Sequence, residues 1–339
     1  MDIEALKKWF LEQKRDFAWR VSPTSYAVWI SEVMLQQTRA KVVEGYFERW
    51  MILFPNVKAL ALAPQEEVIK AWEGLGYYNR ARNLHLAAKY ILKKYKGVIP
   101  DKREELEKIK GLGPYTVGAL LSFAFHQKAA AVDANVTRVL ARYYHVEEDV
   151  TKAETKQLIQ LKTENLLPEI EPWVCMEALI ELGSLVCGKV AKCIKCPIKE
   201  GCKTRELKSQ HLLPKKPPKK KVELLHRNVI VLMYQDSVLL RKTGSGLMAD
   251  LYEFPYFEKE KPQEEILLTF LAREAIYQQH LNVVNHTFTH FKATLFPSIW
   301  RALRKEMFSN YIWVLTKDLT KFPFSAGHRK IIQQIEGMR

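Results

Sequence analysis

Four closely spaced cysteines are the residues of this chain whose chemistry is easiest to state. They are Cys187, Cys193, Cys196 and Cys202, which fall within 16 residues, while Cys175 lies outside the group. Because disulfides do not persist in a reducing cytosol, four clustered thiols predict a metal site. The C-x5-C-x2-C-x5-C spacing by itself leaves zinc and a [4Fe–4S] cluster open.

Two carboxyl groups stand in contrasting local sequences. Glu32 lies in "WISEVMLQQT", with Val28 and Leu35 about one helical turn away on either side. An apolar setting disfavours the anion, so Glu32 should keep a proton near neutral pH, although a surface glutamate is the alternative. Asp133, in "AVDANV", is placed to cap the helix that follows it. Such a pair can protonate a leaving group and stabilise positive charge.

The stretch "KGLGPYTVGALLSFAF" predicts a tight joint between two helices. Gly111 and Gly113 leave a turn without large side chains, and Pro114 suits the first position of the next helix. Backbone N–H groups at such a turn can meet a phosphate directly, whereas a plain helix–helix connection is the alternative. Tyr115 is the first large side chain after the joint.

The charge of the chain favours a polyanionic partner. The 339 residues carry a formal net charge of +15, and residues 208–221 hold six lysines and no acidic residue. An excess of this kind fits nucleic acid first and a membrane surface second. No apolar run reaches 18 residues and the first 20 residues lack a signal-peptide core, so we expect a cytoplasmic protein.

The elements that must position these residues change character at a lysine- and proline-rich segment. Residues 1–207 show helical patterns nearly throughout, including a run from Ser22 to Phe54 that is broken only by its glutamines. Residues 208–224 predict an extended, poorly packed linker. Residues 225–339 predict a smaller α+β domain, with a hairpin around Gln235 and a strand in "HTFTHFKATLF".

Three long motifs carry a resemblance to a known family. "KGLGPYTVGALLSFAF…AVDANVTRVLARYY", "WISEVMLQQTRAKVV" and "WEGLGYYNRARNLH" resemble the helix-hairpin-helix DNA glycosylases, and within them the MutY-type adenine glycosylases. With the cysteines, the resemblance covers residues 17–207. It implies a multi-domain protein: an all-α helix-hairpin-helix glycosylase fold with an Fe–S cluster loop, DNA in the cleft between its halves, and an α+β Nudix-like domain after it.

The resemblance assigns catalytic roles to the residues already singled out. It implies that Glu32 protonates adenine, while Asp133 stabilises the oxocarbenium-like sugar with support from Asn135. In the related endonuclease III-type enzymes, a lysine at the position of Tyr115 attacks the sugar and forms a Schiff base. Tyrosine lacks that amine, and in MutY relatives it sits against the aspartate. Ala134 stands where the family usually has glycine.

The resemblance also implies a set of DNA contacts. Gln37 and Tyr77 would fill the gap left by the flipped base, and Arg20 and Glu177 would contact the flipped adenine. For Arg20 and Glu177, an ordinary surface charge is the alternative. The remaining implied contacts to DNA come from Thr38, Gly111 and Gly113.

The same resemblance implies roles for the four cysteines and for the C-terminal domain. Its members hold a [4Fe–4S] cluster, with six residues in the first cysteine interval where this chain has the five of "GKVAK". Phe288, Thr289 and His290 match its Phe-Ser-His loop, which detects 8-oxoguanine. Glu265 and Arg273-Glu274 echo a Nudix box, but Tyr277 and Gln278 replace the metal-binding glutamates, so we do not expect nucleotide hydrolysis.

The sequence therefore predicts an adenine-specific DNA glycosylase of base-excision repair. We expect a monomer that acts on double-stranded DNA at adenine mispaired with 8-oxoguanine or guanine, and that removes the base without cutting the strand. One alternative is an endonuclease III-like glycosylase and lyase, which Tyr115 opposes. Another is a catalytically silent lesion-binding protein, which would need neither Glu32 nor Asp133.

Overall fold

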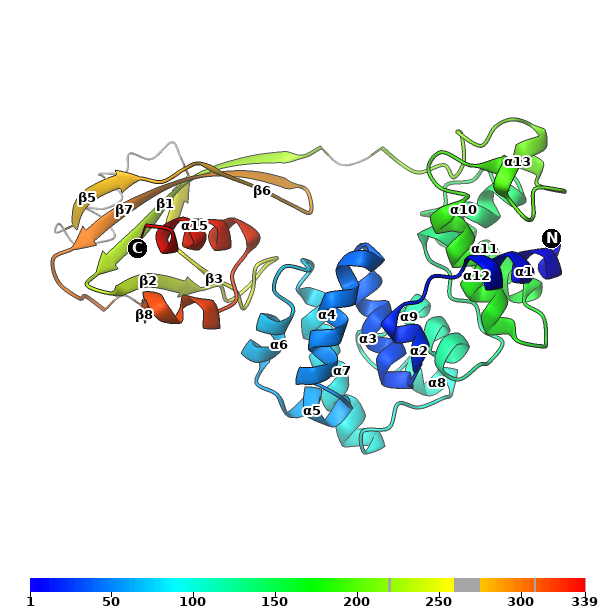
Figure 1. Cartoon of the computed structure of the whole chain (residues 1–339), viewed down its shortest axis with the longest axis horizontal. Coiled ribbons are helices and arrows are strands. Elements are labelled where there is room, and N and C mark those ends of the chain that lie inside the picture. The colour runs from blue at the N-terminus through cyan, green and yellow to red at the C-terminus, as the bar shows by residue number, and fades with distance from the viewer. Residues whose placement is uncertain (219–220, 259–274, 308, 339) are drawn as a thin grey trace. The chain divides into compact units, whose positions relative to one another are not determined.

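The computed structural model describes residues 1–218, 221–258, 275–307 and 309–338 (Figure 1). The chain splits into two compact units. The first unit is Met1–Leu62 with Asn83–Pro218, and the second unit is Ala63–Arg82 with Lys219–Arg339. Residues 63–82 thus pack with the C-terminal residues, although they lie within the predicted helical domain. The domain boundaries at residues 207 and 225, expected from the sequence, remain a prediction.

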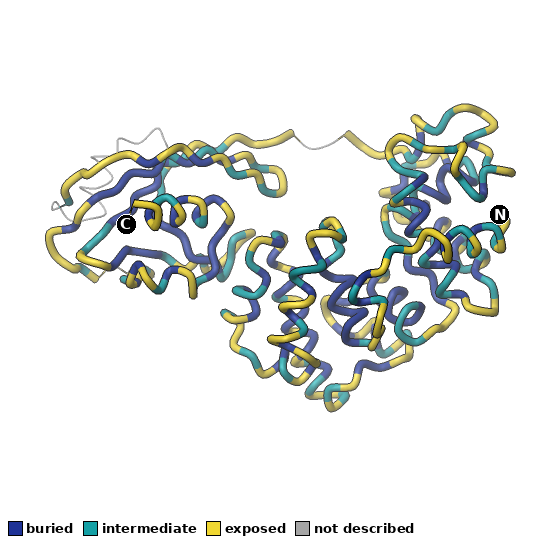
Figure 2. Tube along the Cα trace, viewed as in Figure 1, coloured by how far each residue is buried: buried dark blue, intermediate teal, exposed yellow. Residues whose placement is uncertain are grey.

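The first unit is built from helices. They are α1 (Ile3–Gln13), α2 (Ala18–Val21), α3 (Ser25–Leu35), α4 (Ala40–Leu53), α5 (Val57–Leu62), α7 (Asn79–Tyr95, which enters from the second unit), α8 (Arg103–Leu106), α9 (Pro114–Ala119), the π-helix η1 (Leu120–Ala124), α10 (Ala134–Tyr143), α11 (Ala153–Leu166), α12 (Pro172–Leu185), η2 (Cys193–Lys195) and α13 (Lys203–Glu206). Most of these helices bury one face and expose the other, as the alternating colours in Figure 2 show. No helix among the described residues is long and apolar enough to cross a membrane.

Helix α3 is buried on all sides. Every residue from Tyr26 to Met34 is buried, including Ser31 and Glu32. A helix that is apolar around its whole circumference lies inside a protein. The burial of Glu32 is therefore a consequence of the helix that carries it.

The helical run from Ser22 to Phe54 forms two helices, divided at the glutamines that interrupt its apolar pattern. Helix α3 begins at Ser25, with the Thr24 side chain accepting a hydrogen bond from the Ala27 N–H, and it ends at Leu35. Helix α4 starts at Ala40, and Gln37 between them has a φ of +58°. A left-handed residue cannot continue an α-helix, so the chain turns at the glutamines.

The glycine joint forms as predicted. Gly113 is the N-cap of α9, and Pro114 is its first residue. Gly111 has a φ of +102°, which favours glycine, and a Cβ there would also be crowded, at 3.0 Å from the Cβ of Asn83. A Cβ on Gly113 would meet nothing within 4 Å. The fold gives no steric reason for glycine at 113, whose surface is open to an incoming group.

The second unit is a mixed sheet with helices. Its elements are α6 (Gln65–Ala71), β1 (Glu223–Tyr234), β2 (Ser237–Lys242), β3 (Tyr252–Glu253), β4 (Tyr256–Glu258), β5 (Ala275–His280), β6 (Val284–Phe288), β7 (Phe291–Ala302), β8 (Tyr311–Leu315), the 3-10 helix η3 (Thr316–Lys321) and α15 (Ala326–Glu336). The sheet order is β3-β2-β1-β7-β5, with β4 on β1, β6 on β7 and β8 on β2. Strands β1 and β7 are parallel, whereas the other paired strands are antiparallel. Ile331, Ile332 and Ile335 of α15 join the sheet residues in one core.

Of the two predictions for strands in the C-terminal domain, one is confirmed and one is wrong. The hairpin at Gln235 is confirmed, since Tyr234 pairs with Ser237 across a two-residue turn. The single strand expected in "HTFTHFKATLF" is wrong, because Phe288 pairs with Phe291 and the chain reverses between them. Thr289 at the reversal has a φ of +49°, which a continuous strand does not allow.

The linker is packed more closely than its composition predicts. Leu213 is buried, and its carbonyl oxygen accepts a hydrogen bond of 2.9 Å from Nε of Arg142. The Val150 N–H donates to the carbonyl of Lys215. Strand β1 then begins at Glu223, inside the predicted linker. The buried guanidinium needs acceptors, and the linker backbone supplies one of them.

Candidate active site

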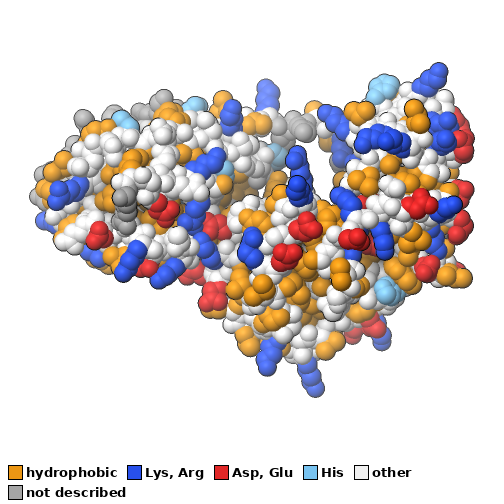
Figure 3. Space-filling view, in the orientation of Figure 1, with side chains coloured by type: hydrophobic (Ala, Val, Ile, Leu, Met, Phe, Trp, Pro, Cys, Tyr) orange, Lys and Arg blue, Asp and Glu red, His pale blue; other side chains and the backbone are white. Residues whose placement is uncertain are grey.

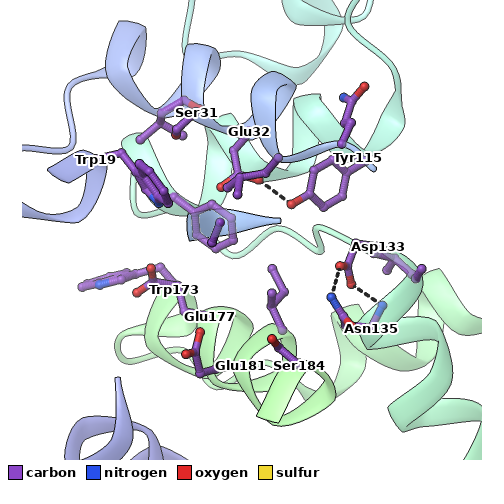
Figure 4. Close-up of a pocket in the computed structure, with 18 of the residues that line it drawn as sticks. Trp19, Ser31, Glu32, Tyr115, Asp133, Asn135, Trp173, Glu177, Glu181 and Ser184 are labelled. Carbon is purple, nitrogen blue, oxygen red and sulfur yellow. Dashed lines mark hydrogen bonds between the residues drawn. The ribbon is translucent and has the colours of Figure 1, made fainter. Parts of the chain in front are cut away.

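A cleft of about 1910 Å³ in the first unit gathers all four predicted catalytic residues and four of the ten predicted DNA contacts. The predicted residues that line it are Arg20, Glu32, Gln37, Thr38, Tyr115, Asp133, Asn135 and Glu177. In Figure 4, Glu32 and Tyr115 lie on one side of the cleft, and Glu177 and Glu181 of α12 lie on the other. The sequence separates these residues by up to about half the chain, so the fold brings them together.

Glu32 is a buried acid held by a tyrosine. It is 8% exposed, and its Oε2 accepts a hydrogen bond from the Tyr115 hydroxyl (Figure 4). Burial raises the pKa of Glu32 to about 7, with smaller increases from Asp133 and Glu177, while Tyr115 and Arg20 lower it. The burial of Glu32 excludes the surface-glutamate alternative, and its raised pKa favours the protonated form near neutral pH.

Asp133 caps α10 as predicted. Its Oδ1 accepts hydrogen bonds of 2.8 Å from the N–H groups of Asn135 and Val136, and its Oδ2 accepts one of 2.7 Å from Nδ2 of Asn135. Burial raises the pKa of Asp133, although these bonds oppose the rise. Ala134 opens α10 without a positive φ, so this position does not require the glycine usual in the family.

Arg138 connects Asp133 to residues 187–203, here called the cysteine segment. The sequence analysis did not predict this connection. Its Nη2 donates to Oδ1 of Asn135 at 2.7 Å and to the carbonyl of Gly183 at 2.6 Å, and its Nε donates to the carbonyl of Cys187 at 2.6 Å. Asn135 in turn donates to Asp133. The only sequence signal is the three-residue spacing from Asn135, which places both on one face of α10.

Arg20 and Glu177 meet in an ion-pair network that includes two further residues. Nε of Arg20 lies 3.1 Å from Oε1 of Glu177, and its Nη2 lies 3.2 Å from Oε2 of Glu181. Arg15 also pairs with Glu181, whose side chain is 1% exposed. Burial raises the pKa of Glu177 while Arg20 lowers it. The four-residue spacing of the two glutamates was the available signal for Glu181.

The remaining predicted DNA contacts lie outside this cleft lining. Tyr77 belongs to the second unit, is 46% exposed and has a φ of +49°. Thr289 and His290 are exposed at the tip of the β6–β7 hairpin, and the ring of Phe288 stacks on Phe291 with centroids 5.3 Å apart. This geometry excludes an ordinary core strand at 288–290.

The Nudix-box residues are only partly within the structure. Glu265 and Arg273-Glu274 lie outside the described residues. Tyr277 and Gln278 lie in β5, where both are exposed. The absence of nucleotide hydrolysis stays a prediction.

The four clustered cysteines lie in and around η2. They are free thiols, and each is half-buried. An isolated bridge between Cys187 and Ala191 closes the five-residue first interval. Burial raises the pKa of Cys196 to about 11, and the other three thiols add to the rise. Within the described residues, no group of three or more His, Cys, Asp or Glu is placed to hold a metal ion.

Comparison with known proteins connects this cleft to a family. Residues 30–165 match the model of the HhH-GPD superfamily base excision DNA repair protein, and residues 228–334 match the NUDIX domain. An adenine DNA glycosylase of Buchnera aphidicola (subsp. Baizongia pistaciae) is 31% identical over 304 residues, which cover 88% of this chain and 85% of that protein. The chain belongs to the adenine DNA glycosylase family.

Other relatives of this glycosylase agree with that placement. The human adenine DNA glycosylase is 31% identical over 354 residues, which cover 86% of this chain and 65% of the human protein. The solved structure of a thermostable thymine-DNA glycosylase matches with a TM-score of 0.55 and 26% identity, over 60% of this chain and 95% of that one. The predicted fold class, a helix-hairpin-helix glycosylase domain followed by a Nudix-like domain, is confirmed, and so is the prediction of an enzyme that acts on DNA.

Proposed function

We propose that this glycosylase removes adenine mispaired with 8-oxoguanine or guanine, and that it cuts only the N-glycosidic bond. The observation that carries the proposal is that the buried carboxyl group of Glu32, whose pKa is raised by its burial, lines the same cleft as Asp133. Breaking the bond to adenine needs a proton on the leaving base and a negative charge near the sugar cation. The monomeric enzyme meets its double-stranded substrate in the cytoplasm.

The two carboxyl groups divide the work by their environments. Glu32, protonated because it is buried, donates its proton to the adenine ring as the glycosidic bond breaks. Asp133, held by two N–H groups and Asn135, faces the positive charge that develops on the sugar. Glu32 is then a carboxylate that can orient the attacking water. Tyr115 fixes the side chain of Glu32 through its hydroxyl.

The absence of an amine at 115 supports base removal without strand cleavage. A lyase needs a nucleophilic amine to form a Schiff base with the sugar. Tyr115 is half-buried and hydrogen-bonded to Glu32, and this burial raises its pKa well above the usual range. It remains a neutral phenol at physiological pH and cannot take that role.

Contacts to DNA are proposed for both units. The open backbone at Gly111 and Gly113 lies at the start of α9 and suits a phosphate. Gln37, Thr38 and Tyr77 contact the DNA where the flipped base leaves the stack. Lysine and arginine side chains are spread over the visible face in Figure 3. The lysines of the cysteine segment are Lys189, Lys192, Lys195, Lys199 and Lys203, and all but Lys199 are exposed. They provide a further phosphate-binding surface.

Single-turnover excision tests the proposed function. The substrates are four duplexes that carry adenine opposite 8-oxoguanine, guanine, thymine or cytosine, each assayed with and without alkali. We expect fast adenine release opposite 8-oxoguanine and guanine, and strand breaks only after alkali. Strand breaks without alkali, together with a borohydride-trapped adduct, would support the endonuclease III-like alternative instead.

We propose that the β6–β7 hairpin reads the base opposite adenine. Exchanging Thr289 and His290 for alanine in one variant should lower the preference for 8-oxoguanine over guanine. A lost hydrogen bond to an atom that guanine lacks is worth about 1–3 kcal/mol, or roughly 5- to 150-fold. The measurement is the ratio of single-turnover rates on the two duplexes.

The chain offers a matched control for that variant in its other two-residue hairpin. Gln235 also has a positive φ, +50°, at an exposed turn of the second unit. Gln235→Ala should leave the ratio unchanged. If the hairpin variant also keeps the wild-type ratio, the lesion is read elsewhere.

We propose that Cys187, Cys193, Cys196 and Cys202 hold a [4Fe–4S] cluster. These four cysteines match the number of thiolates that hold such a cluster, and the cluster would supply an iron–sulfur cross-link between them. A bound cluster would cross-link the segment that Arg138 ties to Asn135. Protein purified without air should be brown and contain about four iron atoms per chain. One zinc per chain and no iron would show that the shorter first interval holds a different metal.

A further inference from the structure

The turn that carries Tyr77 has an unusual backbone. Gly74, Gly76 and Tyr77 have φ values of +99°, +69° and +49°. Glycine tolerates this region, but a tyrosine there is strained. Strained residues persist only where their surroundings fix them. The contacts around this turn therefore decide where the exposed Tyr77 side chain is held.

Part of the support comes from within the segment. Nη2 of Arg80 donates to the carbonyl oxygens of Leu75 and Gly76, each at 3.2 Å. Nε1 of Trp72 donates to the same Gly76 oxygen at 3.0 Å, and the guanidinium of Arg80 lies 5.1 Å from the Trp72 ring centroid. These bonds hold the turn to the two helices that flank it, because Trp72 caps α6 and Arg80 lies in α7.

The anchor is the backbone of one C-terminal residue, Phe324, which is fully buried. Its N–H donates to Oε1 of Glu73 at 3.2 Å, just before the turn. Its carbonyl accepts from the Tyr78 hydroxyl at 3.4 Å, just after the turn, and that hydroxyl accepts from the Gly74 N–H at 3.3 Å. Both polar groups of Phe324 thus hold the two residues that flank the turn.

Arg329 of α15 completes the anchor. Its Nη2 and Nε lie 2.7 and 2.8 Å from Oε1 of Glu73, and Nη2 also donates to the carbonyl of Phe322 at 2.7 Å. The side chains of Glu73 and Arg329 are only 15% and 21% exposed. Partly buried pairs with several hydrogen bonds resist screening better than exposed pairs do.

Helix α15 also contacts the strand that leads to the lesion-reading hairpin. A Cβ on Gly327 would lie 3.1 Å from the ring of His286 on β6, so the helix packs directly on that side chain. The His286 ring lies 5.0 Å from that of Phe288. One helix therefore touches the base of the hairpin with Gly327 and the Tyr77 turn with Arg329.

We propose that Glu73 and Arg329 are positioning residues that hold Tyr77 for insertion into DNA, and that α15 couples this insertion to the β6–β7 hairpin. The proposal rests on the proposed insertion of Tyr77. Reading the base opposite adenine and wedging the duplex are then tasks of one compact unit, since residues 63–82 and 219–339 pack together. A truncation of the C-terminal residues would remove the anchor of the turn, so point variants in the full chain are the proper test.

The experiment follows the fluorescence of 2-aminopurine placed beside the target adenine, which reports unstacking, together with single-turnover excision. Arg329→Met should slow unstacking about tenfold, the effect of losing hydrogen bonds to a charged group. Arg329→Lys, which keeps the charge, should recover part of the loss. Tyr78→Phe, which removes one hydroxyl, should slow it in the same direction without threatening the fold. Arg304→Met breaks a pair with Glu306 in the same unit and should change nothing.

Combination with Tyr77→Ala separates positioning from general destabilisation. If Arg329 acts through Tyr77, Arg329→Met should cause no further loss in a Tyr77→Ala chain. Equal losses in both backgrounds, or no loss in either, would overturn the positioning role. If Tyr77→Ala alone leaves unstacking unchanged, the insertion of Tyr77 is wrong, and this inference fails with it while the excision chemistry at Glu32 stands.

Discussion

Glu32→Gln should slow the chemical step at least about a hundredfold while duplex binding is retained, because a positioned general acid contributes about that much. Glutamine keeps the shape of the side chain and can still accept the hydrogen bond from Tyr115. It has no acidic proton to give to the leaving adenine. Single-turnover rates and binding to an uncleavable duplex measure the two effects separately. A near-wild-type rate would remove Glu32 as the proton donor.

The pH dependence gives the same prediction a second readout. Since burial raises the pKa of Glu32 to about 7, the acid is protonated below that pH and is lost as pH rises through it. The excision rate should therefore fall on the alkaline side in the wild type. Tyr115→Phe removes a hydrogen bond that lowers this pKa, so the fall should move to higher pH. In Glu32→Gln this limb should disappear.

The sequence predicted local features of the site well, because each depends on neighbours along the chain. The apolar residues around Glu32 predicted its burial, and the position of Asp133 before a helix predicted its cap. Pro114 marked the start of α9 in the same way. The bond from Tyr115 to Glu32 was not predicted, since it joins residues 83 positions apart. The family resemblance implied that Tyr115 sits against Asp133 and implied no bond to Glu32.

Long-range packing also explains what the sequence could not predict about the fold. Residues 63–82 read as helical and were assigned with the other helices, yet they pack with the C-terminal unit. The sequence around Glu73 does not indicate its partner Arg329, because an ion pair between distant residues leaves no periodic pattern in the sequence. The turn at Thr289 was hidden for a different reason: β-branched threonine favours strands, and a positive φ at such a residue is rare.

Asp133→Asn should lower the excision rate by about a hundred- to a thousandfold, comparable to the loss of one group that stabilises transition-state charge. Asparagine caps helices about as well as aspartate, so the bonds from the N–H groups of Asn135 and Val136 to Oδ1 can persist. The substitution therefore removes the negative charge near the sugar while α10 keeps its start. The free energy of unfolding should fall only by the loss of one hydrogen bond, from Asn135 to Oδ2, which is about 1 kcal/mol.

The hydrogen bond at Oδ2 of Asp133 adds a second effect to the Asp133→Asn substitution. Oδ2 accepts from Nδ2 of Asn135, whose Oδ1 is already held by Arg138, so Asn135 cannot turn its amide without losing that bond. Two amide donors would then face each other in Asp133→Asn. Arg138→Gln in the wild-type background frees Asn135 and should cost much less, about tenfold, because the charge of Asp133 remains. Should Asp133→Asn lose duplex binding and stability in proportion to its rate, the residue acts mainly as a helix cap, and the charge near the sugar comes from another group.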